Sequence, residues 1–261
     1  MKLSCVTASY VAELIGYPGD VDWGLAARRI EEAPLLETLA DLLARLAPAR
    51  LDGLEPWFPH VAPSKLTPAL ATQVRRLLSA RGMTVCACAG SVGDPERNPD
   101  GTEECFQVAR KLQAPLIAAH MSAATVPHLA PYCERHGVRI GFENGHEGSA
   151  EEIMAALAAG GDWLGANLDT GNLAAQGGDP VYAVRRLGPR INHVHLKDVP
   201  AIGAHDCVAL GTGIVDVAGV LRELKASGYD GWLSVEIETG DHDPTEEIIA
   251  SAETVRRLWG R

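Results

Sequence analysis

The stretch that predicts the fold of this chain is Ile191-Asn192-His193-Val194-His195-Leu196-Lys197-Asp198. In an extended segment, alternate residues point to opposite sides, so Val194 and Leu196 share one side while His193, His195 and Lys197 share the other. The branched and apolar residues favour a strand in a buried sheet. Two imidazoles and an amine that face inward from such a strand are unfavourable unless polar partners compensate them. The first question is therefore which other strands supply those partners.

Seven further short apolar runs resemble this one and alternate with longer amphipathic segments. We expect strands at 2–9, 50–55, 83–89, 115–120, 138–143, 164–169, 191–196 and 232–238. Apolar residues at three- and four-residue spacing predict helices at 34–46, 68–78, 103–112, 151–158, 217–226 and 246–258. Eight strands, most of them followed by a helix, match the size of an α/β fold of the (β/α)₈ TIM barrel type. We expect one such domain over residues 1–261.

A doubly wound open sheet is the alternative architecture. That fold would place a Gly-x-Gly-x-x-Gly motif after the first strand if it bound a dinucleotide, and the chain has none there. No shift in composition marks a second domain either. Both observations favour the barrel.

Composition restricts the partners. The chain has 34 acidic and 23 basic side chains and a formal net charge of −11, and no basic patch stands out, so a nucleic-acid partner is not expected. The six cysteines lack the spacing of a disulfide framework, which indicates a reducing compartment. The N-terminus lacks the apolar core of a signal peptide, and the chain lacks an 18-residue apolar run. We therefore expect a cytoplasmic protein without a membrane partner.

Charged side chains gather at the ends of the last four predicted strands. In a parallel barrel, functional groups lie at the carboxyl ends of the strands, and the alternation of apolar residues points four side chains into that mouth: Glu143, Asp169, His195 and Glu236. Three carboxylates in one cleft repel one another unless a cation lies among them. Three oxygen ligands and one imidazole suit Mn²⁺, Mg²⁺ or Co²⁺, with Zn²⁺ also possible. The pattern predicts a divalent metal site.

Several short motifs resemble a known family. They are Gly141-Phe142-Glu143-Asn144, Leu168-Asp169-Thr170-Gly171-Asn172, His193-Val194-His195-Leu196-Lys197-Asp198, Leu210-Gly211-Thr212-Gly213 and Ser234-Val235-Glu236. In this order and spacing they resemble the sugar phosphate isomerase/epimerase family, the xylose isomerase-like TIM barrels, which are related to the apurinic endonucleases. The resemblance implies a divalent metal bound by the four residues above. It also implies that Glu143 and Glu236 are catalytic and exchange the proton next to a substrate carbonyl through an enediolate.

Five residues are candidates for substrate binding. His193 and Lys197 either contact a substrate oxygen or orient His195 or Asp198. Asn172 stands where many members of the family have histidine, and an amide is a poor ligand, so a second metal is not expected. His120 ends the fourth predicted strand, and Trp57 offers an aromatic wall for a sugar ring, although either residue could simply pack a loop.

The resemblance implies a metal-dependent isomerase or epimerase that acts on a small polyhydroxy substrate, a sugar or a cyclitol. A dehydratase of a keto-cyclitol or dehydroshikimate-like substrate is the alternative, because the same proton abstraction starts both reactions. An endonuclease and a non-catalytic carbohydrate-binding barrel are less favoured, and a homo-oligomer is possible. Two departures leave the substrate open: residues 199–203 contain no arginine, and Gly211-Thr212-Gly213 replaces the more usual Gly-Glu-Gly.

Overall fold

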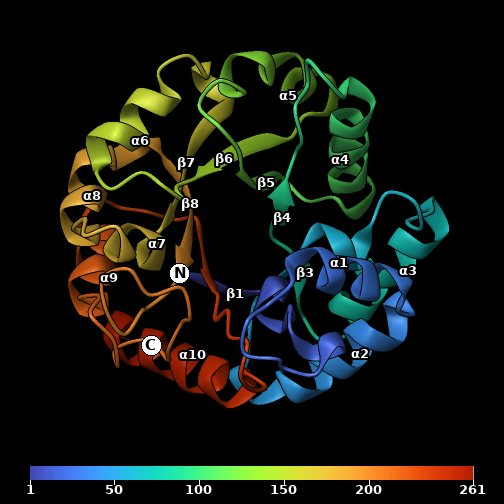
Figure 1. Ribbon diagram of the computed structural model, residues 1–261, viewed down its shortest axis with the longest axis horizontal. Coiled ribbons are helices and arrows are strands. Elements are labelled where there is room, and N and C mark those ends of the chain that lie inside the picture. The colour runs from blue at the N-terminus through green and yellow to red at the C-terminus, as the bar shows by residue number, and fades with distance from the viewer. Residues whose placement is uncertain (261) are drawn as a thin grey trace.

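A computed structural model describes residues 1–260 and places all the strands in one parallel sheet that curls into a nearly closed barrel (Figure 1). The strands are β1 (Lys2–Val6), β2 (Gly53–Glu55), β3 (Thr84–Val85), β4 (Cys88–Ser91), β5 (Leu116–His120), β6 (Arg139–Glu143), β7 (Leu164–Asp169), β8 (Ile191–Leu196) and β9 (Trp232–Val235). Their order in the sheet is β3-β2-β1-β9-β8-β7-β6-β5-β4. The predicted barrel is confirmed.

The predicted third strand is split into two. β3 pairs with β2, whereas β4 pairs with β5, and only Cys86 and Ala87 separate the two short strands. An isolated parallel bridge between Trp57 and Ala89 links this region to the chain that follows β2. The two strands therefore occupy one of the eight expected barrel positions.

The helices surround the strands (Figure 1). They are α1 (Trp23–Glu32), α2 (Leu35–Arg45), α3 (Pro68–Ser79), α4 (Pro99–Leu112), α5 (Ala130–His136), α6 (Ala150–Leu157), α7 (Thr170–Ala175), α8 (Pro180–Leu187), α9 (Val217–Ala226) and α10 (Thr245–Trp259). The sequence did not predict α1, α5, α7 and α8. Three of them have only six to eight residues, and α1 buries only Ala26 and Ile30, so each offers few apolar repeats to a sequence pattern. None of the helices described in residues 1–260 is long and apolar enough to cross a membrane.

Three strand ends were predicted wrongly, because residues 7–9, 50–52 and 236–238 lie outside the strands. At two of these ends, side-chain hydroxyls accept hydrogen bonds in place of the backbone carbonyls of a neighbouring strand. The hydroxyl of Thr7 accepts a hydrogen bond from the backbone N–H of Trp57, and the hydroxyl of Ser9 accepts one from Ile237. These local acceptors end the regular pairing and turn the chain into loops.

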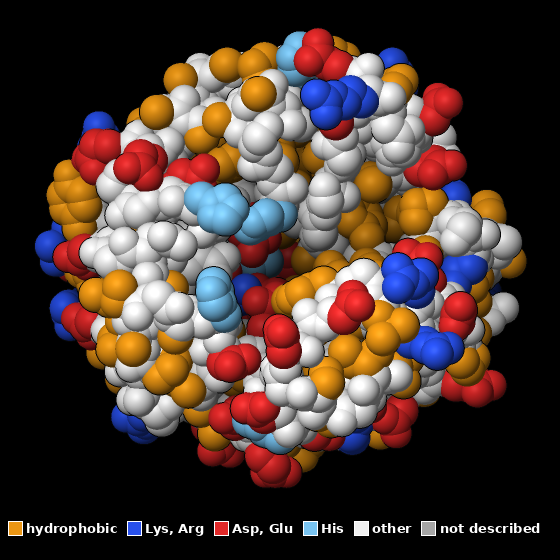
Figure 2. All heavy atoms as spheres, in the orientation of Figure 1, with side chains coloured by type: hydrophobic (Ala, Val, Ile, Leu, Met, Phe, Trp, Pro, Cys, Tyr) orange, Lys and Arg blue, Asp and Glu red, His pale blue; other side chains and the backbone are white. Residues whose placement is uncertain are grey.

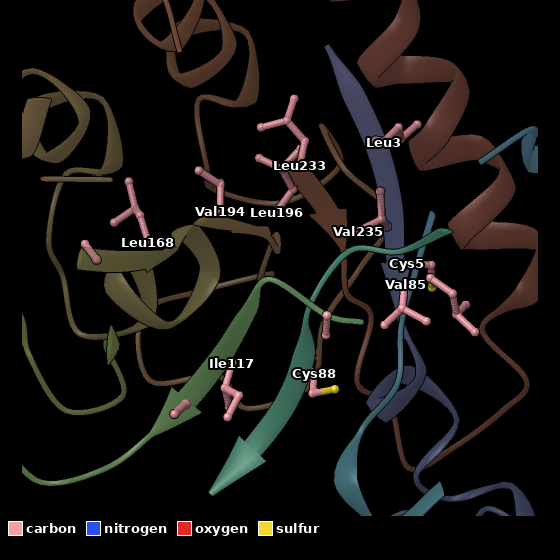
Figure 3. Packing of buried hydrophobic residues seen from close by; sticks show 14 of the residues in the cluster. Leu3, Cys5, Val85, Cys88, Ile117, Leu168, Val194, Leu196, Leu233 and Val235 are labelled. Carbon is pink, nitrogen blue, oxygen red and sulfur yellow. The ribbon is translucent and has the colours of Figure 1, made fainter. Parts of the chain in front are cut away.

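The core lies between the sheet and the helices. Figure 3 shows outward-facing residues of the strands in this layer, among them Leu3, Val194, Leu196 and Leu233. Each is at most 1% exposed, and burial of such a side chain contributes about 1.5–3 kcal/mol. A smaller cluster consists of Cys86, Ala87, Leu116 and Ala118. The alternation in β8 therefore points Val194 and Leu196 to the helices and leaves the histidines for the barrel interior.

A buried histidine near the barrel gives a prediction about stability. His60 is 3% exposed, and its Nδ1 lies 3.0 Å from the hydroxyl of Thr7. Burial and the charge of Lys65 lower its pKa to about 3, well below the ordinary 6.5. Below pH 6.5 the unfolded chain therefore binds a proton at this residue that the folded chain rejects. The free energy of unfolding falls by about 1.4 kcal/mol per pH unit from this residue down to about pH 3.

We expect wild-type protein to lose about 2 kcal/mol more than a His60→Gln variant between pH 6.5 and pH 5, as measured by urea unfolding. The variant removes the titrating group while keeping a polar side chain. Because the comparison is between pH dependences, a constant loss of stability in the variant does not affect it. Equal losses in the two proteins would show that His60 is protonated in the folded state.

Candidate metal centre

β8 brings His195 among three carboxylates at the carboxyl ends of the strands. Nδ1 of His195 lies 3.4 Å from Oε1 of Glu143 and 2.9 Å from Oε2 of Glu236. One donor atom from each of Glu143, Asp169, His195 and Glu236 lies within 4.8 Å of all the others, and the four residues are buried. The structure thus brings together the four residues that the sequence predicted as metal ligands.

Strand pairing and a helix cap fix the positions of these side chains. His120 pairs with Glu143 in neighbouring strands, and Asp169 pairs with His195, so these side chains lie at the same level of the barrel. Asp169 also caps α7: its Oδ1 accepts a hydrogen bond of 2.8 Å from the backbone N–H of Asn172. Asn144 holds the backbone of Asp169 with hydrogen bonds of 2.9 Å and 3.0 Å. The cap does not use the second carboxylate oxygen of Asp169, Oδ2, which faces the other three residues of the cluster.

Glu55 holds the two histidines of β8 from behind. It ends β2, is fully buried, and accepts hydrogen bonds from Nε2 of His193 (2.7 Å) and Nε2 of His195 (3.0 Å). The hydroxyl of Ser234 donates to it as well, at 2.5 Å. Burial disfavours the charge of Glu55, but both histidines outweigh that effect and lower its pKa. Because Nε2 of His195 donates to Glu55, Nδ1 is the ring nitrogen that faces the three carboxylates, and it would offer its lone pair there when a bound cation replaces its proton.

The sequence analysis did not select Glu55. A signal was present, because Glu55 is the last residue of a predicted strand, as Glu143 is of another. The prediction of inward-facing side chains covered only the last four strands. Extending it to the second strand would have placed Glu55 on the inner face beside β1.

The donor atoms of the site fit a divalent cation. Asp169 Oδ2, His195 Nδ1 and Glu236 Oε2 are buried and lack a partner in hydrogen-bonding geometry among the described residues. Buried polar atoms are nearly always satisfied, and three carboxylates with one imidazole form a usual ligand set for Mn²⁺, Mg²⁺, Co²⁺ or Zn²⁺. Without a cation, Lys197 and His195 are the positive groups beside these three carboxylates.

Lys197 neutralises part of this charge. Its Nζ lies 3.2 Å from Oδ2 of Asp169 and 3.1 Å from Oε2 of Glu236, and it donates a 2.8 Å hydrogen bond to Glu238. Burial disfavours the ammonium form, but these carboxylates raise the pKa of Lys197 well above its ordinary value. Burial in turn raises the pKa of Glu238 to about 7 and that of Asp169 to about 6, although Lys197 opposes both shifts. Lys197 is therefore a fixed cation within the site.

A cavity of about 920 Å³ opens above these groups. Figure 2 shows it as a hollow at the centre of this face, with acidic and histidine side chains around it. Four of the predicted substrate-binding residues line it: Trp57, His120, Asn172 and Lys197. His193 does not. Its side chain is 1% exposed and bound to Glu55, so the structure supports the alternative interpretation, a role in orienting the site.

The walls of the cavity include groups that the sequence analysis missed. Trp23 of α1 meets Trp57 edge to face, with ring centroids 5.7 Å apart. His120 lies against Gly145, where an added Cβ would be 2.4 Å from its ring, so this position requires glycine. Trp23 was missed because α1 itself was not predicted.

The Gly211-Thr212-Gly213 motif forms a loop around Asp198. The buried carboxylate of Asp198 accepts hydrogen bonds of 2.9–3.0 Å from the backbone N–H groups of Val199, Gly211, Gly213 and Val215. A Cβ on Gly213 would lie 2.3 Å from the carbonyl oxygen of Val199. This part of the motif therefore holds the loop after β8 and does not itself line the cavity.

A family model for the xylose isomerase-like TIM barrel matches residues 43–258. The chain belongs to this family. The match confirms the resemblance that the short motifs indicated.

Two curated relatives are the rhizopine catabolism protein MocC of Rhizobium meliloti and an inosose dehydratase of Bacillus thuringiensis (strain Al Hakam). MocC is 33% identical over 138 residues, which are 45% of this chain and 41% of MocC. The dehydratase is 27% identical over 156 residues, 51% of this chain and 52% of the dehydratase.

The chain thus spans about half the length, or less, of these two relatives. Solved structures of the xylose isomerase-like type share the fold. The IOLI protein with a bound zinc atom superposes with a TM-score of 0.72 at 17% identity, covering 100% of this chain and 98% of that one. A D-psicose 3-epimerase in the presence of D-fructose gives a TM-score of 0.70 at 14% identity and covers 100% of both chains. At such identities the likeness concerns the fold. The relatives that match this chain include enzymes, both dehydratases and epimerases.

Proposed function

We propose that this xylose isomerase-like barrel is a metal-dependent isomerase or epimerase of a small polyhydroxy ketone or aldehyde. The proposed ligands are Glu143, Asp169, His195 and Glu236, and the proposed catalytic residues are Glu143 and Glu236. A divalent ion bound by these ligands would polarise the substrate carbonyl and so make the neighbouring C–H bond more acidic. The remaining chemistry belongs to the side chains.

The observation that carries the proposal is the placement of two carboxylates. Glu143 and Glu236 both line the cavity and both belong to the cluster around His195. They come from the ends of β6 and β9, which β7 and β8 separate in the sheet, and we propose that they reach the two faces of a bound molecule. One carboxylate takes the proton from carbon, and the conjugate acid of the other returns a proton to the opposite face.

The charge state of Glu143 suits a base. Burial opposes its ionisation, but the charges of His195 and Lys197, with that of His120, outweigh burial and lower its pKa to about 2. The carboxylate is therefore ionised at neutral pH, as a general base must be, while the same charges weaken it as a proton acceptor. Trp57 and Asn172 are proposed to position the substrate, the first against a ring face and the second through its amide.

Dehydration is the second candidate, and the curated relatives favour it, since one of them is an inosose dehydratase. The first step is the same removal of a proton next to the carbonyl. The outcome changes if a hydroxyl on the next carbon leaves as water, which requires a proton donor. His120 lines the cavity beside Glu143 and is the proposed donor for that step.

Incubation of Mn²⁺-loaded protein with ketoses and keto-cyclitols in D₂O tests both candidates. We expect deuterium at the carbon next to the carbonyl, as detected by NMR, and no deuterium after treatment with EDTA. An unchanged substrate mass apart from deuterium supports epimerisation, whereas loss of water supports dehydration. The absence of exchange across the panel, with metal bound, would contradict the proposed function.

A further inference from the structure

The lining of the cavity indicates the charge of the molecule that it accepts. We propose that the substrate carries neither a phosphate nor a carboxylate group, so that the enzyme acts on free, uncharged polyhydroxy compounds. This inference rests on the proposed function for the identity of the reaction. Its electrostatic basis, however, is independent of that function and can be tested separately.

Apart from the proposed divalent ion, the side chains of the cavity offer little to an anion. Among the described residues that line it, Lys197 is the one lysine or arginine. Lys197 is 2% exposed. Its ammonium group lies within 3.2 Å of three carboxylates, those of Asp169, Glu236 and Glu238. A phosphate or carboxylate would have to compete with these three carboxylates for the ammonium group. Proteins that bind these anions usually present a free guanidinium or ammonium group.

Two helix starts near the cavity are capped by carboxylates of the chain itself. Helix N-termini are frequent anion sites because their first N–H groups lack partners. α7 begins next to the cluster, but the carboxylate of Asp169 accepts the N–H of Asn172 at its first turn. α1 begins beside Trp23, and the carboxylate of Asp22 accepts the N–H of Leu25 at 2.9 Å. Both helix starts already hold an anionic cap.

The rim of the cavity is acidic. Asp20, Asp206 and Asp241 line it and are exposed. Figure 2 shows acidic and histidine side chains beside the hollow. A cleft lined by one sign of charge repels ligands of the same sign and lowers their local concentration. The formal charge of −11 for the whole chain acts in the same direction.

The remaining lining suits an uncharged polyol. Trp57 and Trp23 provide an apolar wall on one side, against which the C–H face of a ring can pack. His120, His146, His205 and Gln176 line other parts of the cavity and offer hydrogen-bonding groups to hydroxyls. An uncharged compound with many hydroxyl groups uses both kinds of wall and meets no repulsion.

Quenching of tryptophan fluorescence tests the charge of the cavity without any substrate. The wild type is compared with a Trp23→Phe/Trp57→Phe variant, and the difference isolates the two cavity tryptophans. We expect iodide to quench this difference signal at least threefold less than caesium does, after normalisation to free tryptophanamide at equal ionic strength. Acrylamide, which is uncharged, controls for access. Iodide quenching equal to or greater than caesium quenching would overturn the proposal.

A second comparison uses the reaction. For a ketose that exchanges deuterium, such as D-fructose or D-psicose, kcat/KM is measured against its 6-phosphate. We expect the phosphate ester to react at least 100-fold less efficiently, and a smaller ratio in an Asp20→Asn/Asp206→Asn/Asp241→Asn variant. A phosphate ester that reacts as well as the free sugar would overturn the proposal. If no compound exchanges, the proposed function fails, while the quenching result still decides the charge of the cavity.

Discussion

Replacement of Glu236 by glutamine is expected to lower the rate of deuterium exchange next to the carbonyl by about 10²–10⁴-fold, and Glu143→Gln to have a similar effect. Glutamine keeps the shape of the side chain but cannot accept the proton. Both carboxylates lie beside Nδ1 of His195, at 2.9 Å and 3.4 Å, so each change also weakens the metal site. The measurement is NMR detection of exchange at saturating Mn²⁺, which compensates for a weaker site.

Glu246→Gln is the matched control, because Glu246 is exposed in the first turn of α10. This variant removes one negative charge far from the cluster and should exchange deuterium at the wild-type rate. Metal content, measured on each variant, separates loss of the ion from loss of the base. Exchange that persists in both Glu143→Gln and Glu236→Gln with metal bound would show that the base is another group.

Replacement of Glu55 by glutamine is expected to weaken metal binding by about 10–100-fold, although Glu55 is not a proposed ligand. A carboxylate accepts hydrogen bonds from both histidines through its two oxygens. An amide has one oxygen, so its NH₂ group must face one imidazole and act as a donor. If that imidazole is His195, its Nε2 becomes an acceptor and the proton moves to Nδ1, the atom that faces the carboxylates. Such a tautomer cannot bind the ion.

Calorimetric titration with Mn²⁺ measures the affinity, and ¹⁵N NMR of the imidazole reports the tautomer, which a purely structural role for Glu55 would leave unchanged. The loss of one partner from a buried charged pair also lowers the free energy of unfolding by about 3–5 kcal/mol. Ser234→Ala is the control, since it removes a single hydrogen bond to Glu55 and should leave the tautomer as it is. Wild-type affinity in Glu55→Gln would contradict the positioning role.

Much of the fold was predictable because the signals are local. Alternation in β8 places Val194 and Leu196 under the helices, and the same two-residue period at the ends of β6 and β7 points Glu143 and Asp169 inward. Parallel strands in a barrel bring their carboxyl ends to one rim. A strand period and a fold class were therefore enough to predict that four ligands meet. The short helices α5, α7 and α8 escaped because six to eight residues hold too little of the helical period.

The sequence by itself determined the barrel, the inner face of β8 and the four candidate ligands. This was possible because buried apolar residues recur at every second position of a strand. The tertiary structure alone showed that Glu55 binds His193 and His195, which lie 138 and 140 residues further along the chain. It also showed that Glu55 keeps His193 out of the cavity and that Lys197 is held by three carboxylates. These contacts depend on which side chains meet across the closed barrel, and no local period in the sequence encodes such meetings.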